Sequence, residues 1–341
     1  MSMSSLVIRE FRASDVDSIR ELSAKLFSDA RPKEYFVWNF VDNPVSKGVG
    51  MVAEDSGRIV AHVAMLPRGL CIGNEVLLGA QGVDSMTDPD HQGLFVPLFS
   101  ACMKLAASTG IEVGYGCPNP KSYPALVYML NWDHTGEIPR WIRLLGARSA
   151  LLMNRSPSRL LASMGMNLLP MGDDNPSGIE VRRDRPTDDE LVSLADDINR
   201  NMPARSCRIA RPKEWFSWRF NNESQRRYQW FSAYRGRDLK AWAVFGLNDW
   251  GEKPLITMAG TEPETLEAAV SAATRQAKNL GITELMSVTN NEDSVRALKA
   301  CGYFQRKSMP LIVKPFTNRT LNANIHLHSS WRIACEDLDS F

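Results

Sequence analysis

Hydrophobic and polar positions follow the same order in both halves of the chain: a short strand-like run, then an amphipathic helix. Residues 6–11 read as a strand, and the apolar residues after it recur every three or four positions, as on one face of a helix. Those residues are Val16, Ile19, Leu22 and Leu26. The second half opens likewise, with a strand at 179–181 and then Leu191, Leu194 and Ile198. The pattern therefore predicts a repeated strand–helix unit.

The elements that follow also occur in the same order twice. The first helix of each half is predicted to begin at a capping box, formed by Ser14 with Asp17 and by Thr187 with Glu190. Alternating patterns predict further strands at 51–54, 59–63, 69–72, 76–86, 111–116 and 134–145 in the first half, and at 230–234, 239–245, 282–288 and 310–313 in the second. Helical spacing predicts helices at 94–108 and 122–130, and at 264–280 and 292–300.

A ten-residue sequence that occurs twice supports this duplication. Residues 31–40, RPKEYFVWNF, return as 211–220, RPKEWFSWRF, with seven of ten positions identical. The offset of 180 residues is far longer than a solenoid repeat and is the length of a domain. We predict two copies of one fold, with the aromatic helices 31–40 and 211–220 as walls of each core.

Composition narrows the class of protein. The chain has 341 residues, 44% hydrophobic and 23% charged, as in soluble globular proteins, and a net charge of +1. This charge gives no reason to expect nucleic acid or an anionic membrane as partner. No apolar stretch is long enough to span a membrane, and no signal peptide is predicted. The six cysteines form no CxxC pair, which indicates reduced thiols, a cytoplasmic protein and no metal site.

The order strand, two helices, antiparallel strands, helix, strand, helix, strand resembles the GCN5-related N-acetyltransferase (GNAT) fold. This resemblance covers nearly the whole chain and implies an α/β (α+β) class. Each copy would be a mixed, mostly antiparallel sheet flanked by helices. The implied division is a catalytic domain at 1–148, a linker at 149–177 and a degenerate copy at 178–341. In this family acetyl-CoA lies in a V-shaped opening between two central strands.

The cofactor's pyrophosphate sits, in this family, on a loop that opens a helix, where free backbone N–H groups and the helix dipole bind phosphate. The matching loop is 87–95, TDPDHQGLF. It keeps Gln92 and Gly93 of the family pattern but has Phe95 and Pro97 where glycine or alanine follows; aligned on Gly93 instead, the loop is shorter. The cofactor-binding residues implied by the resemblance are Ser85, Met86, His91, Gln92, Gly93, Leu94, Phe95, Asn119 and Ser122.

A second matching segment is 117–123, CPNPKSY, which precedes the helix at 122–130. It resembles acetyltransferases of bacterial polysaccharide gene clusters, as does the C-terminal sequence 331–339. Asn119 is expected to cap the helix and to border the cofactor.

The resemblance also implies catalytic roles. The acceptor amine must be neutral to attack the thioester, so a base is required. The candidates are Asp84 and Glu112 on the flanking strands and His91 on the loop, with Asp84 as the first choice. Tyr128 and Tyr123 are the alternatives for the acid that protonates the leaving thiolate. A backbone N–H near Ser85 or Met86 would hold the thioester oxygen. Each of these side chains also has an ordinary structural interpretation, as a solvated strand residue or as packing.

The second copy departs from the family pattern. At its pyrophosphate position the chain reads GTEPET at 260–265, with two carboxylates that would repel a phosphate. Leu298 stands where the family has its tyrosine. We therefore predict one active site per chain, in the first copy.

The predicted function is acetyl transfer from acetyl-CoA, with no metal, to a primary amine of a small acceptor such as an amino sugar. A non-catalytic binding or scaffold protein and an aminoacyl-transferase-like enzyme are the alternatives. A monomer or a homodimer is expected.

Overall fold

The structure, a computed structural model, describes residues 6–27, 31–73, 75–145, 178–221, 226–247, 254–316 and 323–338. They form two compact units, each built from more than one segment of the chain. Unit 1 comprises Met1–Glu137, Ala204–Ala210 and Met309–Trp331, and unit 2 comprises Ile138–Pro203, Arg211–Ser308 and Arg332–Phe341. In neither unit does a described helix have the length and apolar character needed to cross a membrane.

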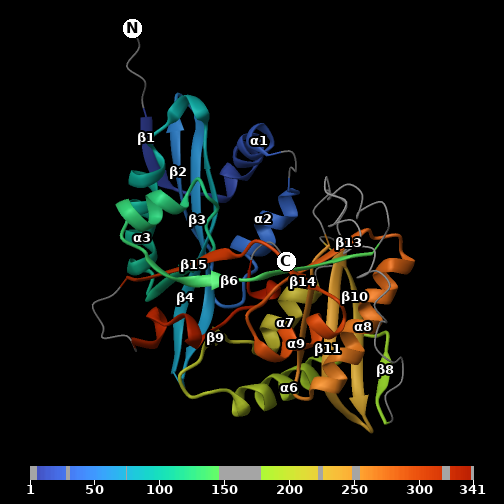
Figure 1. The fold of residues 1–341 in the computed structure, drawn as a ribbon. Helices are drawn as coiled ribbons and strands as arrows, with labels where there is room; N and C mark the ends of the chain where they lie inside the picture. Colours follow the sequence, from blue (N-terminus) through green and yellow to red (C-terminus); the bar gives the residue numbers. More distant parts are fainter. Residues whose placement is uncertain are drawn as a thin grey trace, which may run out of the picture. The chain divides into compact units, whose positions relative to one another are not determined.

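Unit 1 is a long sheet with helices on its faces (Figure 1). Its strands are β1 Leu6–Glu10, β2 Val49–Asp55, β3 Arg58–Ile72, β4 Glu75–Thr87, β5 Val113–Gly116, β6 Asp133–Ile138, β9 Cys207–Ile209 and β15 Met309–Pro315. Its α-helices are α1 Val16–Leu26, α2 Lys33–Phe40 and α3 Phe95–Ser108. Among the described residues the main strand order is β1-β2-β3-β4-β5-β15-β6. Strands β4 and β5 are parallel, whereas the pairs β1–β2, β2–β3, β3–β4 and β5–β15 are antiparallel.

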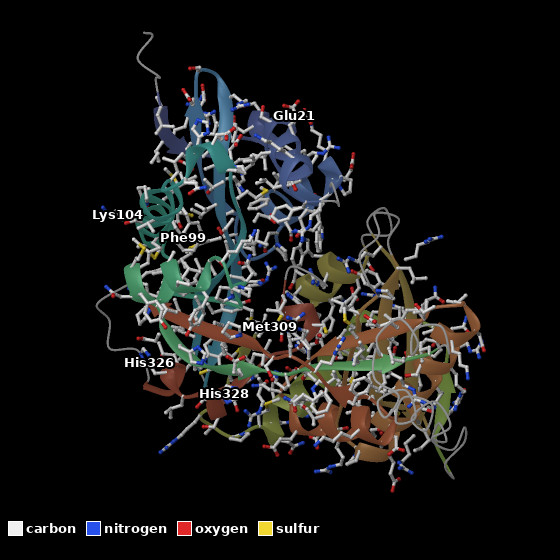
Figure 2. The ribbon with its side chains drawn as sticks, turned by 45° about the horizontal axis from the view of Figure 1, so that its top comes forward. Glu21, Phe99, Lys104, Met309, His326 and His328 are labelled. Carbon is white, nitrogen blue, oxygen red and sulfur yellow. The ribbon has the colours of Figure 1, made fainter. Side chains whose placement is uncertain are left out.

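The core of unit 1 lies between the sheet and helix α3. Leu98, Phe99 and Cys102 of this helix are buried against strands β2 and β3. Figure 2 labels Phe99 on the helix where it covers the sheet. Burying one such apolar side chain stabilises the fold by roughly 1.5–3 kcal/mol. Gly110 ends the helix at φ +88°, as its position after an apolar face predicts.

Unit 2 holds two smaller sheets. Its strands are β7 Arg140–Leu144, β8 Glu180–Arg182, β10 Arg227–Arg235, β11 Asp238–Leu247, β12 Ile256–Gly260, β13 Glu284–Val288 and β14 Phe304–Gln305. Its α-helices are α6 Asp188–Asn201, α7 Lys213–Phe220, α8 Pro263–Asn279 and α9 Glu292–Ala300. In the described part of the unit the strand orders are β12-β11-β10-β8 and β13-β7-β14. The alanine-rich face of α8 packs on Phe231 and Phe245.

Each unit takes strands from the other half of the sequence, and in unit 1 the short strand β9 pairs with β3. Strand β15, near the C-terminus, pairs with β5 in unit 1, and β7, from the first half, pairs with β13 and β14 in unit 2. Neighbouring strands are joined by backbone hydrogen bonds, which do not depend on the side chains. The last strand of either copy can therefore pair at the edge of either sheet. The division 1–148, 149–177 and 178–341 remains a prediction about the duplicated sequence, and 149–177 lies outside the described residues.

Both repeated aromatic helices form, as α2 and α7, and both are walls of a core. Tyr35, Phe36 and Phe40 are buried in the first and Trp215 and Phe216 in the second. The repeated arginine lies over the aromatic residue four positions later in each copy, 4.5 Å from the Tyr35 ring centre for Arg31 and 5.5 Å from that of Trp215 for Arg211.

One of the two predicted capping boxes is present. Thr187 and Glu190 form theirs at the start of α6. The box of Ser14 and Asp17 is wrong, because α1 follows a 3-10 turn at Ala13–Asp15 and its N-cap is Asp15. The Asp15 carboxylate accepts hydrogen bonds from the Arg9 guanidinium at 2.7 and 2.9 Å, which fixes this turn.

Candidate functional site

The candidate site of unit 1 lies where two parallel central strands separate. Strands β4 and β5 pair only at Gly79–Val113, Ala80–Gly114 and Gln81–Tyr115. Beyond these pairs β4 continues to Thr87 while the chain leaves β5 after Gly116. A cavity of about 50 Å³ opens there. Its walls include Gly82 and Ser85 of β4, Gly116 at the end of β5, and Cys117 and Ser122 after it.

A β-bulge shapes the wall of this cavity. His62 pairs with Met86 but Ala64 pairs with Val83, so Asp84 and Ser85 together face a single residue of β3. Asp84 has φ +47°, an uncommon conformation for a residue other than glycine. A bulge leaves one residue out of the hydrogen-bond ladder. Ser85 of this bulge lines the cavity, whereas Asp84 does not. The backbone near Ser85 can therefore offer an N–H group to a bound carbonyl.

Buried side chains hold the bulge in place. The Nδ1–H of His62 donates to the Asp84 carbonyl at 2.9 Å. His62 is almost completely buried, and this burial lowers its pKa from 6.5 to about 4, so the ring is neutral at pH 7. The Asp84 carboxylate accepts a hydrogen bond from Arg31 at 3.0 Å, and Arg31 also donates to the Tyr35 hydroxyl at 2.6 Å. The first aromatic helix thus positions the predicted base.

His62 should make unit 1 sensitive to acid. The folded protein holds His62 neutral down to about pH 4, whereas the unfolded chain protonates it near pH 6.5. Stability from this group is therefore present above pH 6.5 and is lost as the pH falls towards 4, by roughly 3 kcal/mol in all. Urea unfolding between pH 4 and 7.5 measures this loss. His62→Asn retains an N–H donor but does not titrate, so its free energy of unfolding should fall less over this range; equal losses would contradict the assignment.

The predicted pyrophosphate loop joins β4 to α3. The Asp88 carboxylate closes a turn by accepting from the Asp90 N–H at 3.2 Å and is paired with Lys25 at 2.8 Å. Gln92 and Gly93 are exposed, and Gly93 has φ +93° with open space around its Cα. The loop is therefore open to a ligand at the start of the helix.

Helix α3 offers backbone rather than side chains to this loop. Its N-cap, Leu94, makes no side-chain capping hydrogen bond, and its first turn contains no acidic residue. The side chains of Leu94 and Phe95 pack against the core of unit 1. His91 is held by the Asp55 carboxylate at 3.1 Å, outside the cavity lining.

The segment after β5 forms the opposite wall. As predicted, Asn119 caps it, since its Oδ1 accepts from the N–H groups of Lys121 and Ser122 at 2.9 and 3.0 Å. The turn that follows, Ala125–Met129, is π-helical. Ser122 and Leu126 line the cavity, but neither Tyr123 nor Tyr128 does.

The two tyrosines differ in their surroundings. Tyr128 is 73% exposed. Tyr123 is half-buried and its hydroxyl lies 3.0 Å from Nδ1 of His134. Partial burial raises the pKa of the Tyr123 phenol, and the nearby Tyr128 and Glu137 raise it further. This phenol therefore keeps its proton at neutral pH.

Sequence reasoning missed several residues of the cavity. Tyr115, Phe99 and Trp132 line it, as does Ile312 of β15, the strand contributed by the second half. The aromatic residues gave no signal beyond apolar spacing. Ile312 gave none, because a strand exchanged between copies leaves no local trace in the sequence.

The corresponding opening in unit 2 is filled by the chain's own C-terminal segment. Leu255, directly before β12, forms an isolated parallel bridge with Met286 of β13. Beyond it, Ala334 bridges to Thr289 at the end of β13, and the Val288 N–H donates to the Cys335 sulfur at 2.8 Å. We call the segment Ile333–Leu338 the tail plug.

Charged groups anchor the tail plug. Glu336 and Asp337, both buried, pair with Arg211 at 2.9 and 2.8 Å, and the Thr257 hydroxyl of β12 donates to Glu336. Burial raises the pKa of Glu336 to about 7, although Arg211 acts in the opposite direction. The tail plug therefore contacts β12 and β13 of unit 2 at the position that corresponds to the cavity between β4 and β5 in unit 1.

Two more differences separate the copies. Strand β12 pairs with β11 without a register shift, from Ala241–Gly260 to Phe245–Ile256, so unit 2 lacks the bulge there. Glu262 and Glu264 flank the start of α8, and both are paired with Arg235. In the described residues of either unit, no three His, Cys, Asp or Glu side chains are placed to hold a metal ion.

Comparison with known proteins agrees with this architecture. Residues 7–133 match the family described as acetyltransferase (GNAT) domain. No curated protein sequence matches the chain. A tandem GNAT protein from the clavulanic acid biosynthesis pathway, solved without acetyl-CoA, is 13% identical with a TM-score of 0.62, over 92% of this chain and 99% of that one.

Two enzymes share the fold at similarly low identity. N-myristoyltransferase from Saccharomyces cerevisiae with bound myristoyl-CoA is 12% identical, with a TM-score of 0.66 over 92% of this chain and 83% of that one. A glucosamine N-acetyltransferase region of a fungal β-N-acetylglucosaminidase is 16% identical, with a TM-score of 0.59 over 92% of this chain and 38% of that one. Residues 7–133 thus match a GNAT acetyltransferase domain, in a chain with the fold of GNAT proteins that include a tandem one.

Proposed function

We propose that this chain is an acyltransferase that moves an acetyl group from acetyl-CoA to a primary amine of a small acceptor. One observation carries the proposal: a cavity between two separating parallel strands, with a β-bulge in its wall. The bulge supplies a backbone N–H that could hold the thioester oxygen as negative charge develops on it. Unit 1 would contain the active site.

The cofactor would lie along the loop and the start of α3. The free N–H groups of the first helical turn, together with Gln92 and Gly93, would bind the pyrophosphate. Asn119 and Ser122 would border the cofactor from the other wall. His91 would act only through its contact with Asp55.

The size of the cavity favours a short acyl group. About 50 Å³ is a third of the roughly 150 Å³ of a cavity that holds one benzene molecule. An acetyl group is much smaller than benzene, whereas a myristoyl chain, such as the yeast neighbour binds, would need a much larger space. We therefore favour acetyl-CoA over longer acyl-CoA.

The reaction would proceed by direct attack. The nitrogen lone pair of the acceptor adds to the thioester carbon, and the nitrogen loses its proton to Asp84. The C–S bond then breaks, and the thiolate takes a proton from Tyr123. Burial and the contact with His134 support Tyr123 over the exposed Tyr128 as this donor.

The acceptor we propose is a small amine, with amino sugars as the first class to test. The glucosamine N-acetyltransferase region of the fungal neighbour supports this choice through the shared fold alone. We also propose that the chain is related to acetyltransferases of bacterial polysaccharide gene clusters, which would be consistent with an amino sugar as acceptor.

Calorimetric titration with acetyl-CoA tests the proposal. We expect one molecule bound per chain, because the tail plug fills the second opening. Gly82→Leu, which adds a side chain to the cavity wall, should weaken binding at least tenfold. Release of free thiol with glucosamine, spermidine or a peptide amine then identifies the acceptor. If acetyl-CoA does not bind at millimolar concentration, the proposal is wrong, and a non-catalytic scaffold or an aminoacyl-transferase-like enzyme becomes the better interpretation.

A further inference from the structure

Unit 2 contains a larger cavity, apart from the opening that the tail plug fills. It measures about 290 Å³ and lies between the chain that follows β8 and the first residues of β10. This is about twice the roughly 150 Å³ of a cavity that holds one benzene molecule. Its lining includes Arg183, Arg185, Phe220, Trp230 and Gln276.

The cavity begins where a strand ladder stops. Strand β8 pairs with β10 only from Tyr234 to Ser232. Residues 229–231 of β10 remain paired with β11 on the other side. Residues 183–185 leave the sheet, and the Ser232 hydroxyl holds this turn by donating to the Asp184 carbonyl at 2.7 Å. The cavity is therefore part of the folded sheet edge.

The register of the strand pairs shows which residues of the two copies occupy equivalent positions at this edge. Arg9 pairs with Val52 in the first copy, as Arg182 pairs with Ser232 in the second. Two residues further on, Phe11 of the first copy therefore corresponds to Asp184 of the second.

The first copy fills this position with a ring. Phe11 packs on Phe40 with ring centres 5.7 Å apart. In the second copy Asp184 stands there, and the ring is supplied from β10 by Trp230, 4.8 Å from Phe220. The edge of the second copy has lost an apolar side chain, and the cavity lies at that place.

Polar side chains at the cavity retain hydrogen-bonding capacity. Among the described residues, the side chains of Arg183, Gln229 and Gln276 make no hydrogen bond. Nε of Arg185 is also buried without a partner, while its Nη2 is bound to Asp188. A guanidinium presents a planar fork of donors that suits a carboxylate.

Aromatic side chains form the remaining wall. Tyr228 and Trp230 both meet Phe220 edge-on, with interplanar angles of 75° and 70°. This arrangement gives the cavity a rigid apolar side beside its arginines. Aromatic surfaces of this kind favour a planar ring as ligand.

We propose that this cavity binds a small aromatic carboxylate. Arg183 would receive the carboxylate and the ring would lie against Trp230, with the amides of Gln229 and Gln276 at its rim. This site is independent of the proposed acyl transfer, so its loss should leave the affinity of unit 1 for acetyl-CoA unchanged.

Titration calorimetry of the full chain with benzoate tests the site. We expect saturable binding of one benzoate per chain, and no saturation by benzyl alcohol or inorganic phosphate up to ~10 mM, since the former lacks the charge and the latter the ring. Arg183→Gln should weaken benzoate binding about tenfold or more, as loss of a charged hydrogen bond predicts. Arg183 is exposed, so this change should leave the melting temperature unaltered.

Two further variants make the test specific. Arg182→Gln removes the same charge one residue away, where the side chain pairs with Glu180, and should bind benzoate normally. Asp184→Phe restores the ring of the first copy and should abolish binding. The proposal is overturned if benzoate does not saturate by ~10 mM, if benzyl alcohol or phosphate binds as well, or if Arg182→Gln weakens binding as much as Arg183→Gln.

Discussion

Asp84→Asn is expected to lower the rate of acetyl transfer by about a hundredfold or more, the usual effect of removing a general base. Asparagine has nearly the same shape, and it tolerates the positive φ of this position better than most residues. The bulge and the cavity should therefore persist. We expect kcat to fall while the affinity for acetyl-CoA stays within a factor of about two, as for an interaction made in the transition state. Thiol release with the best acceptor amine and calorimetry with acetyl-CoA measure the two quantities.

Asp90→Asn is the matched control. It removes the same charge from the loop that follows β4, and its rate should equal that of the unchanged protein. If Asp84 serves only to anchor Arg31, the variant will melt at a lower temperature and lose cofactor affinity while kcat per folded molecule is retained. That outcome would remove Asp84 as the base.

Arg211→Met is expected to lower the free energy of unfolding by about 3–5 kcal/mol at pH 8, the cost of removing one partner from a buried charge pair. Arg211 is the shared partner of Glu336 and Asp337 in the tail plug. Without it, two carboxylates stay buried in a medium that disfavours their charge. The loss should be smaller at pH 6, because Glu336, whose pKa is raised to about 7, can then take up a proton. Urea unfolding at the two pH values measures both effects.

Release of the tail plug should also expose Cys335. Its thiol is buried, and this burial raises its pKa to about 12, so it should react with a maleimide very slowly in the unchanged protein. Mass spectrometry should find faster labelling of Cys335 in Arg211→Met. Lys213→Met is the control, since its ion pair with Asp189 is exposed and screened by solvent, so it contributes little to stability. Equal destabilisation by the two substitutions would show that Arg211 does not anchor the tail plug.

Much of the fold could be predicted because local patterns determine local elements. Apolar spacing located α3, α8 and α9, and both aromatic helices formed where the repeat placed them. Glycine identified helix ends, as Gly110 and Gly281 show with φ values of +88° and +76°. The box at Ser14 failed because Asp15 accepts hydrogen bonds from the Arg12 N–H and the Arg9 guanidinium, which fixes a different start for α1. Two local caps competed here, and the one with the additional contact to Arg9 formed.

The candidate site could be predicted only in part. Asn119 behaves as the capping residue its sequence position indicated. The position of Asp84 within a bulge, its contact with Arg31 and the neutral His62 beneath it were not foreseeable, since bulges depend on the register between strands. Which tyrosine faces a proton-accepting partner depended on His134, eleven residues further along the chain.

The duplication and the elements of each copy could be predicted from the residue order alone, as could the presence of Gln92 and Gly93 of the family's loop pattern in the first copy and not in the second. These properties are local or repeated, so they are written in residue order. Which copy each last strand completes, where the central strands separate, and what lies between them depend on contacts between residues far apart in the chain. Backbone ladders accept a strand from either copy, and a buried segment such as Ile333–Leu338 is chosen by contacts with residues far away in the chain. The opening in unit 1 and the plug in unit 2 thus arise from one sequence pattern through different long-range contacts.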